Sequence, residues 1–78
     1  MISHDLLRHV GVRIKELRAK KGLSQESFAH SIGMARTYFA EVETGKRNVS
    51  VINLSRIVNG LDVSLETFFT SELFDEHN

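Results

Sequence analysis

Apolar residues recur at three- and four-residue intervals along most of the chain, which is the spacing of amphipathic helices. The first such segment runs from about Leu6 to Lys21. Its apolar face consists of Leu7, Val10, Ile14 and Leu17. Gly22 follows this segment, and glycine can adopt the left-handed conformation that ends a helix. No segment shows sustained two-residue alternation bounded by hairpin turns, so the pattern predicts an all-α protein.

Serines stand before three of the four remaining predicted helices, where they are good N-caps. Ser24 precedes a helix over about residues 25–32, while Ser50 and Ser64 precede the fourth and fifth helices. The fourth helix is expected to bury Val51, Leu54, Ile57, Val58 and Leu61, and the fifth carries Leu65, Phe68, Phe69, Leu73 and Phe74.

The third predicted helix, over residues 36–43, is preceded by Ala35, a poor N-cap. We therefore expect tertiary packing to stabilise its start, or the start to lie one residue away.

Residues 23–45 have the pattern of a helix-turn-helix. Gly33 lies at the turn between helices 25–32 and 36–43, where positive φ is common. Ala29 is small enough to let the second helix cross the first closely. The positions expected to fix the pair to the core are apolar, namely Ile32, Phe39 and Val42. The pattern predicts one five-helix domain over residues 1–78.

Residues 11–61 resemble the Cro/C1-type (XRE-like) helix-turn-helix family, which includes phage repressors. The matching strings are Arg13-Ile14-Lys15-Glu16-Leu17-Arg18, Gly22-Leu23-Ser24-Gln25-Glu26, Phe28-Ala29, Ile32-Gly33, Arg36-Thr37-Tyr38-Phe39 and Glu43-Thr44-Gly45-Lys46-Arg47. The short length and the strings Arg36-Thr37-Tyr38 and Arg47-Asn48 are most similar to controller proteins of restriction–modification systems. The resemblance implies a lambda-repressor-like fold and a homodimeric regulator that binds promoter DNA.

The charges are unevenly distributed although the net charge is zero. Residues 1–58 hold all ten Lys and Arg and five acids, whereas residues 59–78 hold five acids and no Lys or Arg. A basic end attracts the phosphate backbone and an acidic end is repelled, so this asymmetry would orient the protein on duplex DNA. An accidental dipole is the alternative interpretation.

In helix-turn-helix proteins the start of the second motif helix enters the major groove, where base edges are distinguishable. This geometry places Arg36 and Thr37 at the base pairs, with Tyr38 beside them and Glu41 one turn further. For Tyr38 the alternative is a place in the core, and for Glu41 a solvated face.

Backbone contacts are expected from the start of the first motif helix and from the loop after the second. The residues assigned to them are Ser24, Gln25, Lys46, Arg47, Asn48 and Ser50. The role of Gln25 follows from the family resemblance. The resemblance also implies a partly buried ion pair between Arg18 and Glu43, which would tie the first helix to the recognition helix.

The C-terminal region, about residues 61–74, is more apolar than one short helix can easily bury. Either all of these side chains complete the monomer core, or some form a two-fold interface, which we favour. The candidates for that interface are Leu61, Val63, Leu65, Phe68, Phe69, Leu73 and Phe74. A homodimer would present two recognition helices about 34 Å apart to an inverted-repeat operator.

No catalytic, metal or cofactor signature is present. The four histidines, His4, His9, His30 and His77, lack metal-ligand spacing, and there is no cysteine. Nor is there a nucleophile elbow or a phosphate-binding loop. The sequence therefore predicts no enzyme, cofactor, metal or small-molecule ligand. It also lacks a membrane-spanning run and a secretory signal, which favours the cytoplasm, in association with the nucleoid.

The predicted function is sequence-specific regulation of transcription, with the controller's own promoter as the target. A phage-type repressor and an antitoxin are alternatives, and a protein-interaction adaptor is an alternative of a different class. Activation would need a surface that contacts RNA polymerase, for which Glu26, Glu41 or the acidic end are the candidates.

Overall fold

The computed structural model of the protein describes residues 3–75, with side chains from residue 5 onward. These residues form only helices and connections. The elements are α1 (Ser3–Lys20), α2 (Gln25–Ser31), α3 (Arg36–Glu43), α4 (Val51–Gly60), α5 (Leu65–Phe69) and a short 3-10 helix, η1 (Glu72–Phe74). The predicted all-α fold is confirmed.

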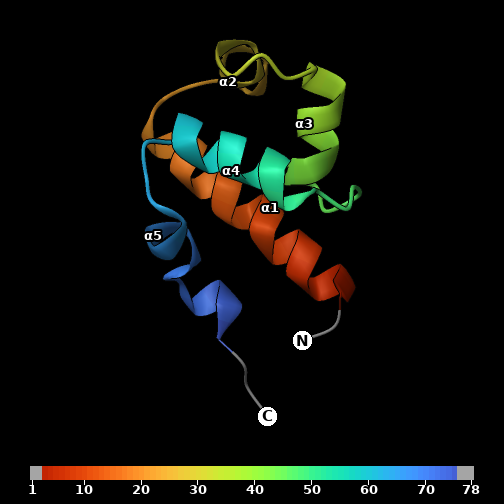
Figure 1. Ribbon diagram of the computed structural model, residues 1–78, viewed down its shortest axis with the longest axis vertical. Coiled ribbons are helices and arrows are strands. Elements are labelled where there is room, and N and C mark those ends of the chain that lie inside the picture. The colour runs from red at the N-terminus through yellow and green to blue at the C-terminus, as the bar shows by residue number, and fades with distance from the viewer. Residues whose placement is uncertain (1–2, 76–78) are drawn as a thin grey trace.

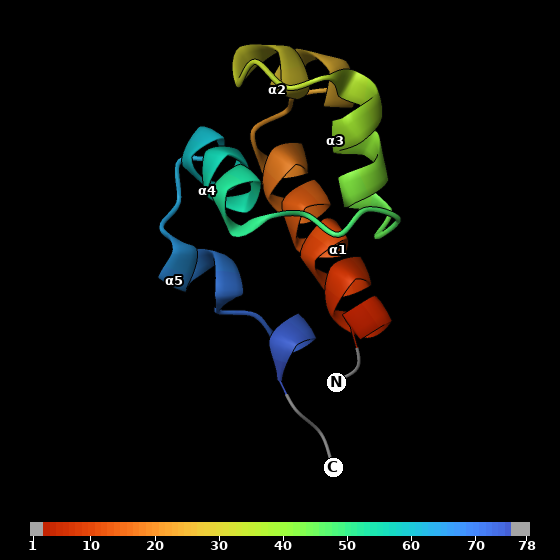
Figure 2. The same ribbon diagram turned by 45° about the vertical axis from the view of Figure 1, so that its right-hand side comes forward.

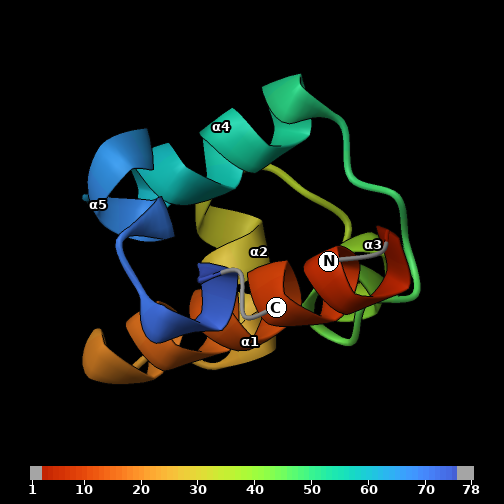
Figure 3. The ribbon, with the colours of Figure 1, turned by 90° about the horizontal axis from the view of Figure 1, so that it is seen from below.

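The long helix α1 runs along the length of the molecule, and the shorter helices pack against it (Figure 1). Helices α2 and α3 are joined by a short turn, and α4 passes alongside α1. Helix α5 lies on the opposite side of the molecule from α3, as the view from below also shows (Figure 3). Among residues 3–75, every helix is too short or too polar to span a bilayer.

The core is formed by apolar side chains from α1 to α5, which agrees with most of the predicted helix faces. Its buried members are Val10, Ile14, Leu17, Phe28, Ala29, Met34, Phe39, Val42, Ile57, Val58, Leu61 and Phe68. The rings of Phe28 and Phe39 lie 5.1 Å apart between centroids. This contact joins α2 to α3 at the centre of the core.

Serine caps begin three of the helices, as predicted. The Oγ atoms of Ser24, Ser50 and Ser64 each accept a hydrogen bond from the backbone amide three residues later, at 3.0 Å. Ala35 occupies the N-cap position of α3 and provides no side-chain hydrogen bond. Helix α3 nevertheless begins at Arg36, because Phe39 and Val42 anchor it in the core.

The fifth helix is shorter than predicted. It ends at Phe69 instead of continuing to Phe74, and a turn at Thr70 and Ser71 leads into η1. The guanidinium of Arg13 in α1 donates to the carbonyl oxygens of Phe68 at 2.7 Å and of Thr67 at 2.9 Å. A longer helix would use these carbonyls for its next turn, so a contact with α1 replaces that turn.

The prediction that Val51 is buried is wrong. Its side chain is 78% exposed, and the adjacent Ile52 is 75% exposed. The buried residues of α4 are Ile57 and Val58 in its second half, whereas Val51 lies in its first turn. Two smaller boundaries also differ, because α1 begins at Ser3 instead of about Leu6 and α2 ends at Ser31.

Candidate nucleic-acid interface

A turn that contains Gly33 joins α2 to α3, as the motif predicts (Figure 2). Gly33 has φ +66°, a left-handed conformation that a side chain would strain. The amide of Met34 donates to the carbonyl of Ala29 at 2.9 Å, and Ala29 itself is buried. These features let the chain reverse over a few residues and place α3 against α2.

Arg18 and Glu43 form an ion pair that connects α1 to the end of α3. Arg18 Nε donates to Glu43 Oε2 at 2.6 Å and Nη2 donates to Oε1 at 3.0 Å. The Glu43 side chain is only 2% exposed. A carboxylate this buried needs its hydrogen-bond partners, so the pair holds the last turn of α3 in one orientation.

Gln25 completes this cluster. Its Nε2 donates to Glu43 Oε1 at 2.8 Å, and the Arg18 guanidinium also donates to the carbonyl of Leu23 at 2.7 Å. The side-chain amide of Gln25, predicted to bind the DNA backbone, therefore also joins α2 to α3. No local pattern indicates this contact, because Gln25 and Glu43 are eighteen positions apart.

The first turn of α3 presents Arg36 and Thr37 to solvent. Within the described part of the chain, no hydrogen bond or ion pair holds the Arg36 side chain. Its guanidinium can therefore donate two parallel hydrogen bonds to an external acceptor, as a guanine base edge requires. Arg36 and Thr37 thus have the exposure that base reading demands.

Tyr38 and Glu41, the other two predicted base-reading residues, are tied to neighbouring elements. Tyr38 is half-buried against the core, and its hydroxyl accepts a hydrogen bond from Asn53 Nδ2 of α4 at 3.1 Å. Glu41 forms an ion pair with Arg47, at 2.8 Å between Oε1 and Nη2. The Arg47 guanidinium also lies 5.0 Å from the centroid of the Tyr38 ring. The loop and α3 therefore form one connected surface.

The remaining residues predicted to contact the DNA backbone lie at the N-cap of α2 or in the segment between α3 and α4. Lys46, Asn48, Ser24 and Ser50 are all exposed. Although the two serine Oγ atoms accept hydrogen bonds as helix caps, each hydroxyl retains a hydrogen that can donate to a phosphate.

Arg56 was missed by the sequence analysis. From α4, its Nη2 donates to the carbonyls of Ile32 at 2.9 Å and of Gly33 at 3.2 Å. Its guanidinium therefore satisfies two carbonyl groups just after the end of α2, within the turn. A basic residue outside the apolar stripe of α4 is a weak signal, and only the packing of α4 against α2 identifies its partner.

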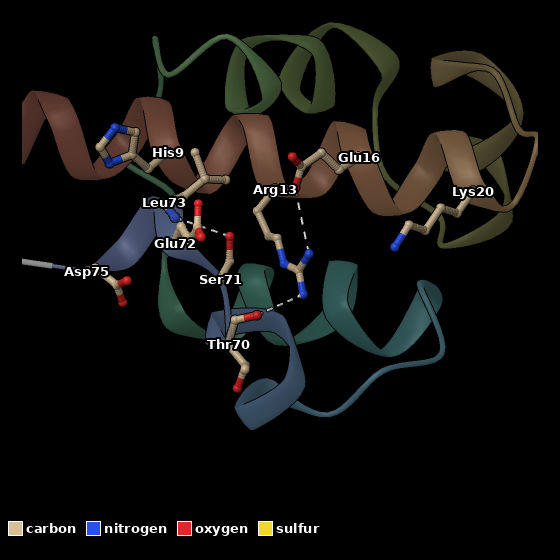
Figure 4. Close-up of a pocket in the computed structure, with 9 residues that line it drawn as sticks. All are labelled: His9, Arg13, Glu16, Lys20, Thr70, Ser71, Glu72, Leu73 and Asp75. Atoms are coloured by element: carbon tan, nitrogen blue, oxygen red, sulfur yellow. Dashed lines mark hydrogen bonds and ion pairs between the residues drawn. The ribbon is translucent and has the colours of Figure 1, made fainter.

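The C-terminal segment packs against α1 along an open groove of about 830 Å³ (Figure 4). Arg13 points from α1 toward Thr70, and Glu16 lies 3.6 Å from its Nη1 atom. Most of the groove lining is polar or charged. The groove thus marks where the chain after α5 returns to α1.

The predicted interface residues separate into three sets. Leu61 and Phe68 are enclosed in this chain's own core, so they offer no surface to a partner. Leu65 is 45% and Phe69 is 39% exposed. The partly buried members are Val63, Leu73 and Phe74. The Phe69 ring stands edge-on to those of Phe68 and Phe74, at 5.0 and 4.9 Å between centroids.

Two short helices, α2 and α3, joined by a tight turn and with the first turn of α3 exposed, are characteristic of helix-turn-helix proteins. The family model described as Helix-turn-helix matches residues 14–68. The chain therefore belongs to the helix-turn-helix family, and the expectation drawn from its sequence strings is confirmed.

Restriction–modification controller proteins are among its most similar relatives. The chain is 46% identical over 68 residues to the control protein C.MunI of a Mycoplasma species, in an alignment that covers 86% of this chain and 92% of that protein. The solved controller protein C.AhdI from Aeromonas hydrophila superposes with a TM-score of 0.76 and 43% identity, covering 81% and 96% of the two chains.

A third relative was solved with DNA. The controller protein C.Esp1396I, as a tetramer in complex with its natural 35-base-pair operator, matches with a TM-score of 0.77 and 39% identity. That match covers 82% of this chain and 84% of the other. The similarity therefore extends over nearly the whole fold.

Proposed function

We propose that this protein is a sequence-specific DNA-binding regulator of transcription, the controller of a restriction–modification system that acts on its own promoter as a homodimer. The observation that carries the proposal is the exposed pair Arg36 and Thr37 at the start of a helix held rigidly by Arg18 and Glu43. The similarity to three controller proteins supports the biological context.

Recognition divides between base contacts and phosphate contacts. Arg36 donates to O6 and N7 of a guanine, and Thr37 offers its hydroxyl to a base or its methyl group to a thymine. Lys46, Asn48 and Ser50 contact phosphates, which sets register and affinity without reading sequence. This division assigns specificity to the first turn of α3.

The homodimer forms through the exposed apolar side chains of α5, on the far side of the molecule from α3. A two-fold axis there would separate the two copies of α3, as an inverted repeat requires. The acidic C-terminal region would then face away from the phosphates, so that repulsion does not oppose binding.

Regulation follows from occupancy of the promoter and needs no catalytic step. A bound dimer blocks RNA polymerase or positions it, and Glu26 and the acidic C-terminal region offer candidate contacts for positioning. Such a protein would act in the cytoplasm at the nucleoid.

The variant Arg36→Ala tests base reading. Against duplexes from the region upstream of its own gene, substituted one base pair at a time, we expect a loss of affinity of about 5- to 150-fold for each half-site, since one bidentate contact contributes about 1–3 kcal/mol. The variant should also lose discrimination at one base pair of each half-site. Fluorescence anisotropy with labelled duplexes measures both quantities.

The matched control is Lys46→Ala. Loss of a phosphate contact should weaken binding to operator and scrambled duplexes alike and reduce the slope of log K against log salt by about 0.9 per bound protomer. If Arg36→Ala bound every duplex as the wild type does, direct readout would be refuted and the adaptor function favoured.

A further inference from the structure

Arg47 is held on the surface of α3 by two side chains. Glu41 Oε1 accepts hydrogen bonds from Arg47 Nη2 at 2.8 Å and from Nε at 3.2 Å. The guanidinium also lies over the Tyr38 ring, whose hydroxyl is fixed by Asn53. Arg47 thus has a defined position, and two of its nitrogen atoms already donate hydrogen bonds to Glu41.

This pairing distinguishes Arg47 from the other cations of the proposed DNA surface. Among the described residues, no acidic side chain pairs with Arg36 or with Lys46. Arg47 alone of these three carries a counter-charge, and that counter-charge comes from the recognition helix itself. A phosphate must therefore compete with Glu41 for Arg47.

A phosphate can compete with Glu41 for Arg47 because the Glu41–Arg47 ion pair is accessible to water. The side chains of Arg47 and Glu41 are 50% and 46% exposed, and an ion pair in such surroundings is weak and screened by salt. A phosphate held at a fixed place beside Arg47 can displace the carboxylate. A phosphate that passes by in a loosely bound complex has a lower effective concentration and displaces it less.

We propose that Glu41 is a specificity-determining residue that withholds Arg47 from the phosphates of non-cognate DNA. The inference rests on the proposed DNA-binding function. On operator DNA, base contacts from Arg36 and Thr37 position α3 in the groove and hold a phosphate near Arg47. Arg47 then breaks its ion pair with Glu41 and binds the phosphate. On random DNA the Glu41–Arg47 pair stays closed, so each protomer makes one phosphate contact fewer.

Glu41→Gln tests this exchange, because it removes the carboxylate charge and keeps the shape of the side chain. On a random duplex we expect affinity to rise by up to about five-fold per bound protomer, the most that one exposed ion pair usually withholds. The slope of log K against log salt should steepen by about 0.9 per bound protomer, the value for one added phosphate contact. On the operator the slope should stay unchanged and affinity should rise less, so the specificity ratio falls.

A double-mutant cycle with Arg47→Gln identifies the route of the effect. If Glu41 acts through Arg47, Glu41→Gln leaves the salt slope on random duplex unchanged in the Arg47→Gln background. Thermal unfolding followed by circular dichroism should show native folding for all three variants, since both side chains are on the surface.

Two results would overturn the inference. One is an unchanged affinity of Glu41→Gln for random duplex; the other is an equal steepening of the slope with and without Arg47, which would show that Glu41 acts through its own charge. A wild-type protein that binds neither operator nor random duplex would instead overturn the proposed function.

Discussion

Gly11 lies where α1 packs tightly against the end of α3. A Cβ atom at this position would lie 2.2 Å from the carbonyl oxygen of Glu43 and 2.9 Å from that of Val42. Both contacts are with backbone, so no change of rotamer relieves them. We expect Gly11→Ala to lower the free energy of unfolding by about 1–3 kcal/mol, although alanine favours a helix by about 1 kcal/mol over glycine. Urea unfolding measures the change.

Gly60→Ala is the matched control in α4. Its Cβ would meet the Cγ2 methyl of Ile32 at 2.5 Å and the Phe28 ring at 3.1 Å. Because these are side-chain atoms that can shift, a smaller loss of stability is expected. If Gly11→Ala were as stable as the wild type, α1 and α3 could not approach each other this closely.

Helix α3 is the element on which recognition depends, and its N-cap is unfilled. Ala35 has φ −60° and ψ 133°, the extended conformation of an N-cap residue. Serine at this position could accept a hydrogen bond from the amide of Tyr38, as Ser24 does from Ser27 in α2. We expect Ala35→Ser to raise the free energy of unfolding by about 0.5–2 kcal/mol, measured by urea unfolding.

Ser50→Ala provides the opposite change in α4. It removes a cap that accepts from Asn53 at 3.0 Å and should lower stability by a similar amount. An Ala35→Ser variant with unchanged stability would mean that the first amides of α3 gain nothing from a cap, and that packing of Phe39 and Val42 alone determines where the helix begins.

In the molecule as a whole, α3 and α5 lie on opposite sides, which separates the proposed DNA surface from the proposed dimer interface. Phe69 is the most exposed aromatic ring of that interface. We expect Phe69→Glu to convert a dimer at micromolar concentration into a folded monomer, because a charge cannot be buried there without a partner. Sedimentation equilibrium measures the association, and circular dichroism checks the fold.

Ile52→Glu is the control, since Ile52 is 75% exposed but lies in the first turn of α4, away from α5. This variant should remain dimeric. A monomeric wild-type protein at micromolar concentration would refute the dimer, and a dimeric Phe69→Glu variant would place the interface elsewhere.

Local patterns were sufficient for much of the fold and for part of the site. The three serine caps, the positive φ of Gly33 and most of the buried stripe depend on residues within about four positions of each other. The exposed Arg36 and Thr37 follow from the same motif. The Arg18–Glu43 pair spans twenty-five positions and was expected only because of the family resemblance.

Other features depend on contacts between residues that belong to different elements of the fold. Arg13 ends α5 by taking its last carbonyls, and Arg56 binds the turn between α2 and α3. Arg47 pairs with Glu41 only because the loop folds back over α3. Nothing in the local spacing of these residues identifies such partners.

Neighbouring residues along the chain specify most of the helices, the helix-turn-helix and the residues at the start of its second helix, because helix periodicity and capping are interactions between near neighbours. The packing of the helices sets which charges are paired, where the fifth helix stops and which C-terminal aromatics stay exposed. Those outcomes depend on the angles and distances at which the helices cross, and no single helix specifies these.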